Sequence, residues 1–162
     1  MELSISIRDF TPVDAPAIVA IQRTAAQAAQ WQAADYEHLS REAGGIILVA
    51  QVHGTGAVIG FLAARLMGEE AELYNLAVAE SRRRRGVGKG LVREFHRRLE
   101  AGGVRRVWCE VRASNAPAVS LYHEFGYVES GVRRNYYAND SEDALVLQCG
   151  LRAAGVESGG SV

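Results

Sequence analysis

The sequence predicts an α/β protein built on a mixed β-sheet with helices on both faces. β-prone runs and amphipathic helical runs follow one another in the order β-α-α-β-β-β-α-β-α-β-β, and turn residues separate them. With 162 residues, 48% of them hydrophobic, the chain suits one domain that buries about two thirds of its surface. We expect that domain over residues 1–151, followed by a flexible, polar tail over residues 152–162.

The first half begins with a strand and two helices. Residues 3–8 alternate apolar and polar side chains, and residues 11–27 have a proline at the first helical position, followed by an apolar stripe. The weaker, polar segment 31–42 predicts a second, short helix. Two β-prone runs, 46–52 and 57–66, are separated by a glycine-containing turn and therefore predict a hairpin.

The second half alternates strands with helices and closes with two strands. Helices are expected over residues 88–100, which carry an apolar face, and from Asn115, a good helix cap, to Gly126. Strands are expected at residues 71–78, 104–111, 127–136 and 143–150.

Composition narrows the class of protein. The formal net charge is −1, so the run from Arg82 to Arg85 is a local feature, and a basic nucleic-acid-binding face is not expected. Cys109 and Cys149 lie in apolar runs and the four histidines are scattered, which predicts neither a disulfide framework nor a metal site. The sequence shows no signal peptide and no apolar run of membrane length, so we expect a cytoplasmic protein.

The segment Arg84-Arg85-Gly86-Val87-Gly88-Lys89 links a predicted strand to a predicted helix. Its glycines allow a tight turn and leave the first N–H groups of the helix free to point at a ligand. These donors and the helix dipole bind phosphates, and the neighbouring cations add charge-assisted contacts. The segment therefore predicts a pyrophosphate cradle, with a solvated basic turn as the alternative.

The spacing of the glycines excludes two common phosphate loops. A Walker loop requires Ser or Thr after Gly-Lys, where this chain has Gly90, and a dinucleotide fingerprint requires glycine where it has Leu91. The pattern that remains, R-x-x-G-x-G from Arg83 to Gly88, resembles the acetyl-CoA pyrophosphate loop of the GNAT superfamily of N-acyltransferases.

A second, longer segment is more specific. From Trp108 to Tyr122 the chain reads WCEVRASNAPAVSLY, which resembles the fifth strand and following helix of the RimI-type ribosomal-protein alanine N-acetyltransferases. The resemblance covers roughly residues 72–147, and it includes NLAV at 75–78 and RRNYY at 133–137. The N-terminal half matches in outline only, because Ala29-Gln30-Trp31 replaces the family's aromatic-Pro-Trp segment.

This resemblance implies a GNAT-type, mostly antiparallel sheet and acetyl-CoA as cosubstrate, without a metal. It implies Glu110 as general base, Tyr122 as general acid, and Asn115 as both helix cap and cofactor ligand. An α-amine is largely protonated at neutral pH, so its acetylation independently requires a carboxylate that accepts a proton. The remaining cofactor-binding positions that the resemblance implies are the backbone of Leu76, Ala77 and Val78 and the loop residues Arg84, Arg85, Gly86, Val87, Gly88 and Lys89.

Structural alternatives exist for the site residues. Glu110 could instead be a strand-end carboxylate paired with Arg106 or Arg112, and Tyr122 could be a core tyrosine. Cys109 beside Glu110 suggests an acyl-enzyme, but strand alternation places the two on opposite faces, so we interpret Cys109 as core. Adjacent Tyr136 and Tyr137 suit either a paired strand or a peptide-binding rim.

Three functions remain open at the level of sequence. The resemblance favours acetylation of the N-terminal alanine of a ribosomal protein, by resemblance small-subunit ribosomal protein eighteen. The alternatives are a GNAT enzyme for a small amine or a protein lysine, and a binding module such as an acyl-CoA sensor. The expected partner is an N-terminal peptide, with no nucleic acid and no membrane, and a monomer fits the sequence.

Overall fold

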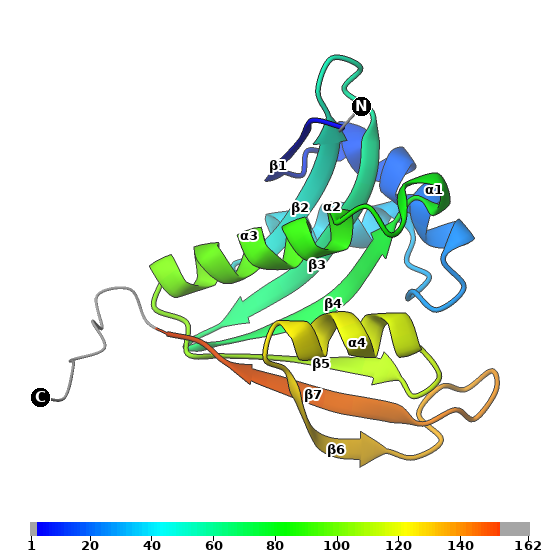
Figure 1. Cartoon of the computed structure of the whole chain (residues 1–162), viewed down its shortest axis with the longest axis vertical. Helices are drawn as coiled ribbons and strands as arrows, with labels where there is room; N and C mark the ends of the chain where they lie inside the picture. Colours follow the sequence, from blue (N-terminus) through cyan, green and yellow to red (C-terminus); the bar gives the residue numbers. More distant parts are fainter. Residues whose placement is uncertain (1–2, 153–162) are drawn as a thin grey trace, which may run out of the picture.

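A seven-stranded sheet in the order β1-β2-β3-β4-β5-β7-β6 organises the chain (Figure 1). The computed structural model describes residues 3–152, so all but the first residue of the predicted tail lies outside the described residues. The strands are β1 (Ile5–Asp9), β2 (Gly45–Val52), β3 (Val58–Met67), β4 (Glu70–Val78), β5 (Arg106–Arg112), β6 (Val128–Arg133) and β7 (Ala144–Gly150). The α-helices are α1 (Ala15–Thr24), α2 (Ala33–Arg41), α3 (Val87–Ala101) and α4 (Ala116–Glu124).

The predicted order of elements and the mixed sheet are confirmed, and two boundaries differ in a useful way. The helix predicted over residues 11–27 starts as a 3₁₀ turn at Pro12–Asp14 and ends at Thr24. The strand predicted over residues 127–136 ends at Arg133. Tyr136 and Tyr137 therefore lie in the connection between β6 and β7 rather than in a ladder, which corrects the paired-strand alternative.

The only parallel pair in the described sheet is β4 with β5, and it is short. Glu70–Leu73 pairs with Arg106–Cys109, and the strands part beyond these residues (Figure 1). From there β4 continues to Val78 with a partner on its β3 side alone. The backbone of residues 76–78 thus borders a gap in the sheet.

A bulge in β4 sets which side chains border this gap. Ala63 pairs with Asn75 while Ala64 pairs with Leu73, so Tyr74 is an extra residue in the strand. Leu73 packs in the core beneath α3 and α4, whereas Tyr74 and Asn75 both face α1 and α2. Asn75 Nδ2 donates to the Tyr36 hydroxyl at 2.9 Å, which satisfies both buried groups.

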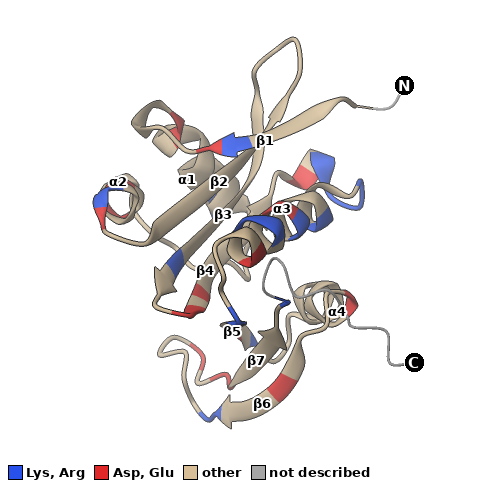
Figure 2. Cartoon of the chain, turned by 90° about the vertical axis from the view of Figure 1, so that its left-hand side faces the viewer, with Lys and Arg blue, Asp and Glu red and all other residues tan. Residues whose placement is uncertain are grey.

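The two faces of the sheet are covered unequally. Helices α3 and α4 cover one face, and α1 and α2 pack on β2, β3 and β4 of the other (Figures 1 and 2). On the α1–α2 face, β5 presents Trp108 and Glu110, which are half-buried and alternate with the buried residues Val107, Cys109 and Val111. That part of the sheet is open to a second molecule.

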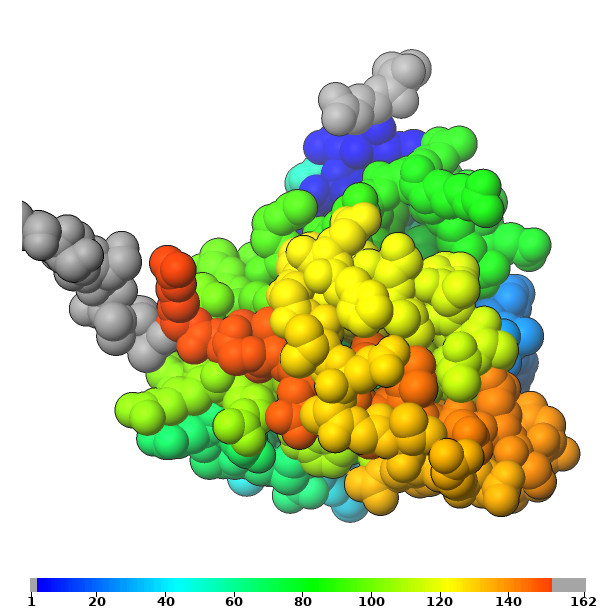
Figure 3. Space-filling model, turned by 60° about the horizontal axis from the view of Figure 1, so that its bottom comes forward, coloured from blue at the N-terminus to red at the C-terminus, as the bar shows by residue number. Residues whose placement is uncertain are grey.

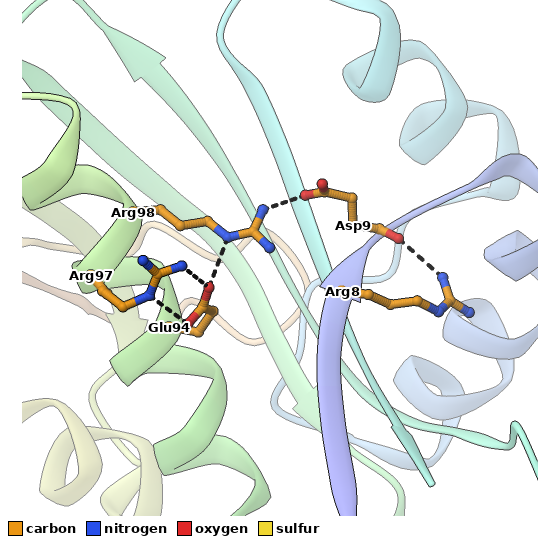
Figure 4. A network of polar contacts seen from close by, with 5 residues as sticks. All are labelled: Arg8, Asp9, Glu94, Arg97 and Arg98. Carbon is orange, nitrogen blue, oxygen red and sulfur yellow. Dashed lines mark hydrogen bonds and ion pairs between the residues drawn. The ribbon is translucent and has the colours of Figure 1, made fainter. Parts of the chain in front are cut away.

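An ion-pair network on α3 reaches the sheet at β1 (Figure 4). Glu94 accepts hydrogen bonds from Arg97 and Arg98, which lowers the pKa of Glu94 to about 2, and Arg98 also pairs with Asp9 of β1. Each exposed pair of this kind contributes little on its own. The apolar face of α3, with Leu91, Phe95 and Leu99 in the core, is what packs the helix on the sheet.

Candidate active site

The loop before α3, here called the α3 loop (residues 83–89), has the geometry of a phosphate cradle. Gly86 caps the helix with φ 81° and ψ 8°, a left-handed conformation that favours glycine. The first helical bond runs from the Gly90 N–H to the Gly86 carbonyl at 3.0 Å. The N–H groups of Val87, Gly88 and Lys89 therefore precede the helical ladder and have no acceptor within it.

The cations of the α3 loop divide into held and free groups. The Arg83 guanidinium donates to the backbone carbonyls of Val78 at 3.1 Å and Thr24 at 3.3 Å, so it fastens the loop. Lys89 pairs with Glu124 of α4 at 3.0 Å. Arg84 and Arg85 form no ion pair with a carboxylate among residues 3–152. Their charges remain available to an anion.

The α3 loop meets the end of β4 and the side of α4. A Cβ added to Gly88 would lie 3.4 Å from Leu121 and 3.8 Å from Val78, at van der Waals contact with both, so the loop packs closely at this junction. Gly60 of β3, which the sequence analysis did not single out, is more tightly enclosed, because an added Cβ would lie only 3.1 Å from Val87. The α3 loop thus meets β3, the end of β4 and the side of α4 at one end of the gap.

Helix α4 begins at the predicted cap and carries Tyr122. The Ala118 N–H donates to Asn115 Oδ1 at 3.2 Å, which confirms Asn115 as a helix cap. Tyr122 is 4% exposed and packs against Tyr127 with ring centroids 5.2 Å apart. Burial raises the pKa of Tyr122 well above its ordinary value, so the phenol stays protonated at neutral pH.

The Tyr122 hydroxyl is free to meet a ligand. It has no hydrogen-bond partner among the described residues, and within them the one fully enclosed side-chain polar atom without a partner is Nε of Arg65. The Tyr122 oxygen therefore keeps some contact with solvent. The Tyr127 hydroxyl differs, because it is hydrogen-bonded to His96 Nε2 at 2.8 Å.

Glu110 lies on the opposite face of β5 and is the centre of a group of polar side chains. Its carboxylate pairs with Arg133 Nε at 2.5 Å, and its side chain is only 13% exposed. Arg106 and Arg112, the partners suggested by the structural alternative, pair instead with Glu70 at 3.5 Å and with Asp140 at 2.8 Å. That alternative is therefore wrong about the partner of Glu110.

Tyr136 and Tyr137 flank this carboxylate from the β6–β7 connection. Hydrogen bonding to Glu110 raises the pKa of Tyr136 to about 12. Tyr136 is 49% exposed and packs edge to face against Tyr137, with their ring centroids 5.1 Å apart. The Arg112 guanidinium lies 3.9 Å from the Tyr137 ring centre. In the space-filling view this connection (orange) forms one corner of the molecule beneath α4 (yellow) (Figure 3).

Sequence reasoning missed two members of this group. Arg133 was noted only as a neighbour of the tyrosines, yet it is the residue that holds Glu110. Glu72 of β4 was also missed, although a carboxylate inside an otherwise apolar strand indicates a candidate functional residue. Glu72 pairs in register with Trp108, so its side chain is on the same face as Glu110. We call Glu72, Glu110, Arg133 and Tyr136 the Glu110 cluster.

The surface also has a groove between α4 and β6–β7, with a volume of about 650 Å³. Ala113, Val119, His123, Glu129 and Leu145 are among the residues that line it. It includes neither the α3 loop nor the Glu110 cluster.

None of the helices within residues 3–152 is long and apolar enough to span a membrane.

Comparison with known proteins places the chain among acetyltransferases. Residues 14–127 match the acetyltransferase (GNAT) family. The [ribosomal protein bS18]-alanine N-acetyltransferase of Escherichia coli K12 is 38% identical over 99 residues, which are 60% of this chain and 67% of that protein. The N-alpha-acetyltransferase of Sulfurisphaera tokodaii is 33% identical over 128 residues, which are 71% of this chain and 74% of that protein.

Solved structures agree over nearly the whole chain. The ribosomal-protein-S18-alanine N-acetyltransferase from Escherichia coli superimposes with a TM-score of 0.82 at 29% identity, over 95% of this chain and 98% of that one. Ard1 from Thermoplasma volcanium gives a TM-score of 0.83 at 29% identity, over 92% of this chain and 99% of that one.

Proposed function

This chain belongs to the acetyltransferase (GNAT) family, and we propose that it acetylates the N-terminal α-amine of a ribosomal protein, with acetyl-CoA as the acetyl donor. The family match and the N-acetyltransferase relatives support the reaction class. Those relatives that are named for ribosomal protein bS18 support an N-terminal alanine of that protein as the acceptor.

The residues around the gap suit acetyl-CoA. The N–H groups of residues 87–89, which have no acceptor within the helix, and Arg84 and Arg85, which pair with no carboxylate among residues 3–152, would bind its pyrophosphate. The backbone of residues 76–78, which has no β5 partner, would pair with the extended pantetheine arm as a strand does. Asn115, at the start of α4, is the remaining residue that we assign to the cofactor.

The observation that carries the proposal is the position of Glu110 and Tyr122 relative to the gap. Acetyl-CoA supplies the acetyl group as a thioester whose sulfur leaves as a thiolate. Glu110, on one face of β5, accepts a proton from the amine, and Tyr122, packed against the other face, donates one to the thiolate. An N–H of residues 76–78 would polarise the thioester carbonyl. Tyr136 and Tyr137 form the rim that receives the peptide.

A peptide panel tests this function directly. Purified protein is incubated with acetyl-CoA and hexapeptides that differ in their first residue, and released thiol is measured together with the mass of the product. We expect acetylation of the α-amine with a preference for alanine at the first position. The matched control is a peptide with a blocked N-terminus and one internal lysine, which should not react. Equal rates on that control would contradict the proposal and favour a lysine acetyltransferase.

A further inference from the structure

Acetylation of an α-amine sets a proton balance that one carboxylate does not meet alone. At neutral pH the acceptor arrives largely as an ammonium group, because α-amines have a pKa near 8. On the way to the amide its nitrogen loses two protons, one before it attacks the thioester and one afterwards. The thiolate takes back one proton, and the other leaves to solvent. The site must therefore move two protons away from one nitrogen.

Glu72 stands where a second acceptor of these protons would be needed. On the α1–α2 face it is the last residue of β4 before β4 and β5 part, since Leu73 and Cys109 are the final pair and both face the other core. Glu110 is the first residue of β5 on this face beyond that pair. The two carboxylates thus flank the point where the gap opens.

Within the described residues the Glu72 carboxylate has no partner, unlike the charged groups around it. On the neighbouring strands Arg106 pairs with Glu70 at 3.5 Å, and Arg65, which is opposite Glu72 on β3, pairs with Glu42 at 3.5 Å. Glu110 pairs with Arg133. Among residues 3–152, no side chain or backbone group forms an ion pair or hydrogen bond with the Glu72 carboxylate, although the Glu72 backbone is paired in the sheet. Its half-buried carboxylate is therefore free to accept a proton.

The charges of the Glu110 cluster favour the binding of a cationic group. When both carboxylates are ionised, Glu72, Glu110 and Arg133 sum to one negative charge, which an ammonium group neutralises. Burial raises the pKa of Glu72, and the nearby Glu110 charge raises it further, while Arg133 lowers it. A proton therefore binds more readily to Glu72 than to an exposed carboxylate.

We propose that Glu72 is the second proton acceptor of this site, so that Glu110 and Glu72 each take one of the two protons that the acceptor nitrogen loses. This rests on the proposed acetylation of an α-amine. The N–C bond forms as the C–S bond breaks, and the thiolate receives its proton from Tyr122. One of the two nitrogen protons restores the Tyr122 hydroxyl, and the other is released to solvent, so charge and atoms balance.

The test compares Glu72→Gln with the unmodified protein on two acceptor peptides. The first begins with alanine. The second begins with trifluoroalanine, whose fluorines lower the pKa of the amine so that it arrives mostly neutral and has one proton fewer to lose. On the alanine peptide we expect kcat to fall roughly 10²-fold, the lower end of what a proton-transfer group contributes. On the fluorinated peptide the ratio between the two proteins should shrink to within a few-fold.

Glu70→Gln is the matched control, because Glu70 is on the same strand and paired with Arg106, and its turnover should be unchanged. A merely structural role would give equal defects on both peptides, and a role in attraction alone would raise KM without changing kcat. Either result overturns the proposal. An unmodified protein that acetylates no peptide would overturn the proposed function as well, whereas an active one indifferent to Glu72→Gln would overturn this inference alone.

Discussion

The α3 loop and the Glu110 cluster border the same gap, but they are built in opposite ways. The loop is contiguous in sequence, and its ligand groups are mainly backbone N–H groups released by the start of a helix. The cluster draws its side chains from β4, β5, the end of β6 and the β6–β7 connection. A site made of backbone appears as a short motif, whereas a site made of side chains exists only once strands have paired.

The difference also bears on what a substitution does. Most side chains of the loop can change without loss of the N–H donors, so apart from its arginines the loop is sensitive mainly in its conformation. In the cluster each side chain has its own task, and Arg133 reaches across β7 to hold Glu110. Substitutions should therefore separate binding of acetyl-CoA from chemistry.

Glu110→Gln gives the sharpest separation. We expect turnover to fall roughly 10²–10⁴-fold at neutral pH, the usual contribution of a general base, because the amide cannot accept the proton. Arg133 would lose its partner, but it is 53% exposed and remains solvated, so folding should be little affected. Released thiol measures turnover, and melting curves with acetyl-CoA measure binding, which should persist. Near-normal turnover across pH 6–9 would contradict the assignment of Glu110 as base.

Gly86→Val tests the α3 loop, on the other side of the gap. Acetyl-CoA at about 100 times its dissociation constant should stabilise the unmodified protein by roughly 2.7 kcal/mol, and the variant should lose that gain. Valine cannot adopt the left-handed conformation of Gly86 without strain, so the first N–H groups of α3 would be misdirected.

Gly103→Val is the matched control for this change. Gly103 follows α3, has φ 78° against 81° for Gly86, and at both positions an added Cβ meets nothing within 4 Å. Both variants should lose similar intrinsic stability, but Gly103→Val should keep the acetyl-CoA effect. If the unmodified protein melts at the same temperature with and without acetyl-CoA, the cradle assignment is wrong.

The same contrast explains how far the sequence could be interpreted. Periodicity, capping residues and turns are local, so the order of elements and the Asn115 cap were predictable. The placement of β7 between β5 and β6 was not, because it depends on contacts between distant strands. The bulge at Tyr74 was not predictable either, because the residues around it would be compatible with either face of the strand.

Within the candidate site the limit is the same. Glu110 and Tyr122 were identified from their segment, but the partner of Glu110 is 23 residues away and reaches it only across β7. Glu72 joins the cluster through its register with Trp108, and that register is set by the parallel pairing of β4 with β5. Pairing register is a property of the folded sheet, which one sequence does not reveal.

Tyr122→Phe has the smallest expected effect and tests whether α4 contributes to chemistry or only to packing. The ring and its contact with Tyr127 remain, and the lost hydroxyl has no hydrogen-bond partner among residues 3–152, so the melting temperature should stay close to that of the unmodified protein. Turnover should fall about tenfold or more if the hydroxyl protonates the thiolate. Tyr127→Phe gives the reverse pattern, because it leaves buried His96 without its partner and costs about 1–3 kcal/mol of stability.

The Tyr122→Phe defect should also shrink with an acyl donor whose thiol has a lower pKa, since such a thiolate leaves with less help. Equal defects for good and poor leaving groups would instead make Tyr122 a residue that positions the thioester.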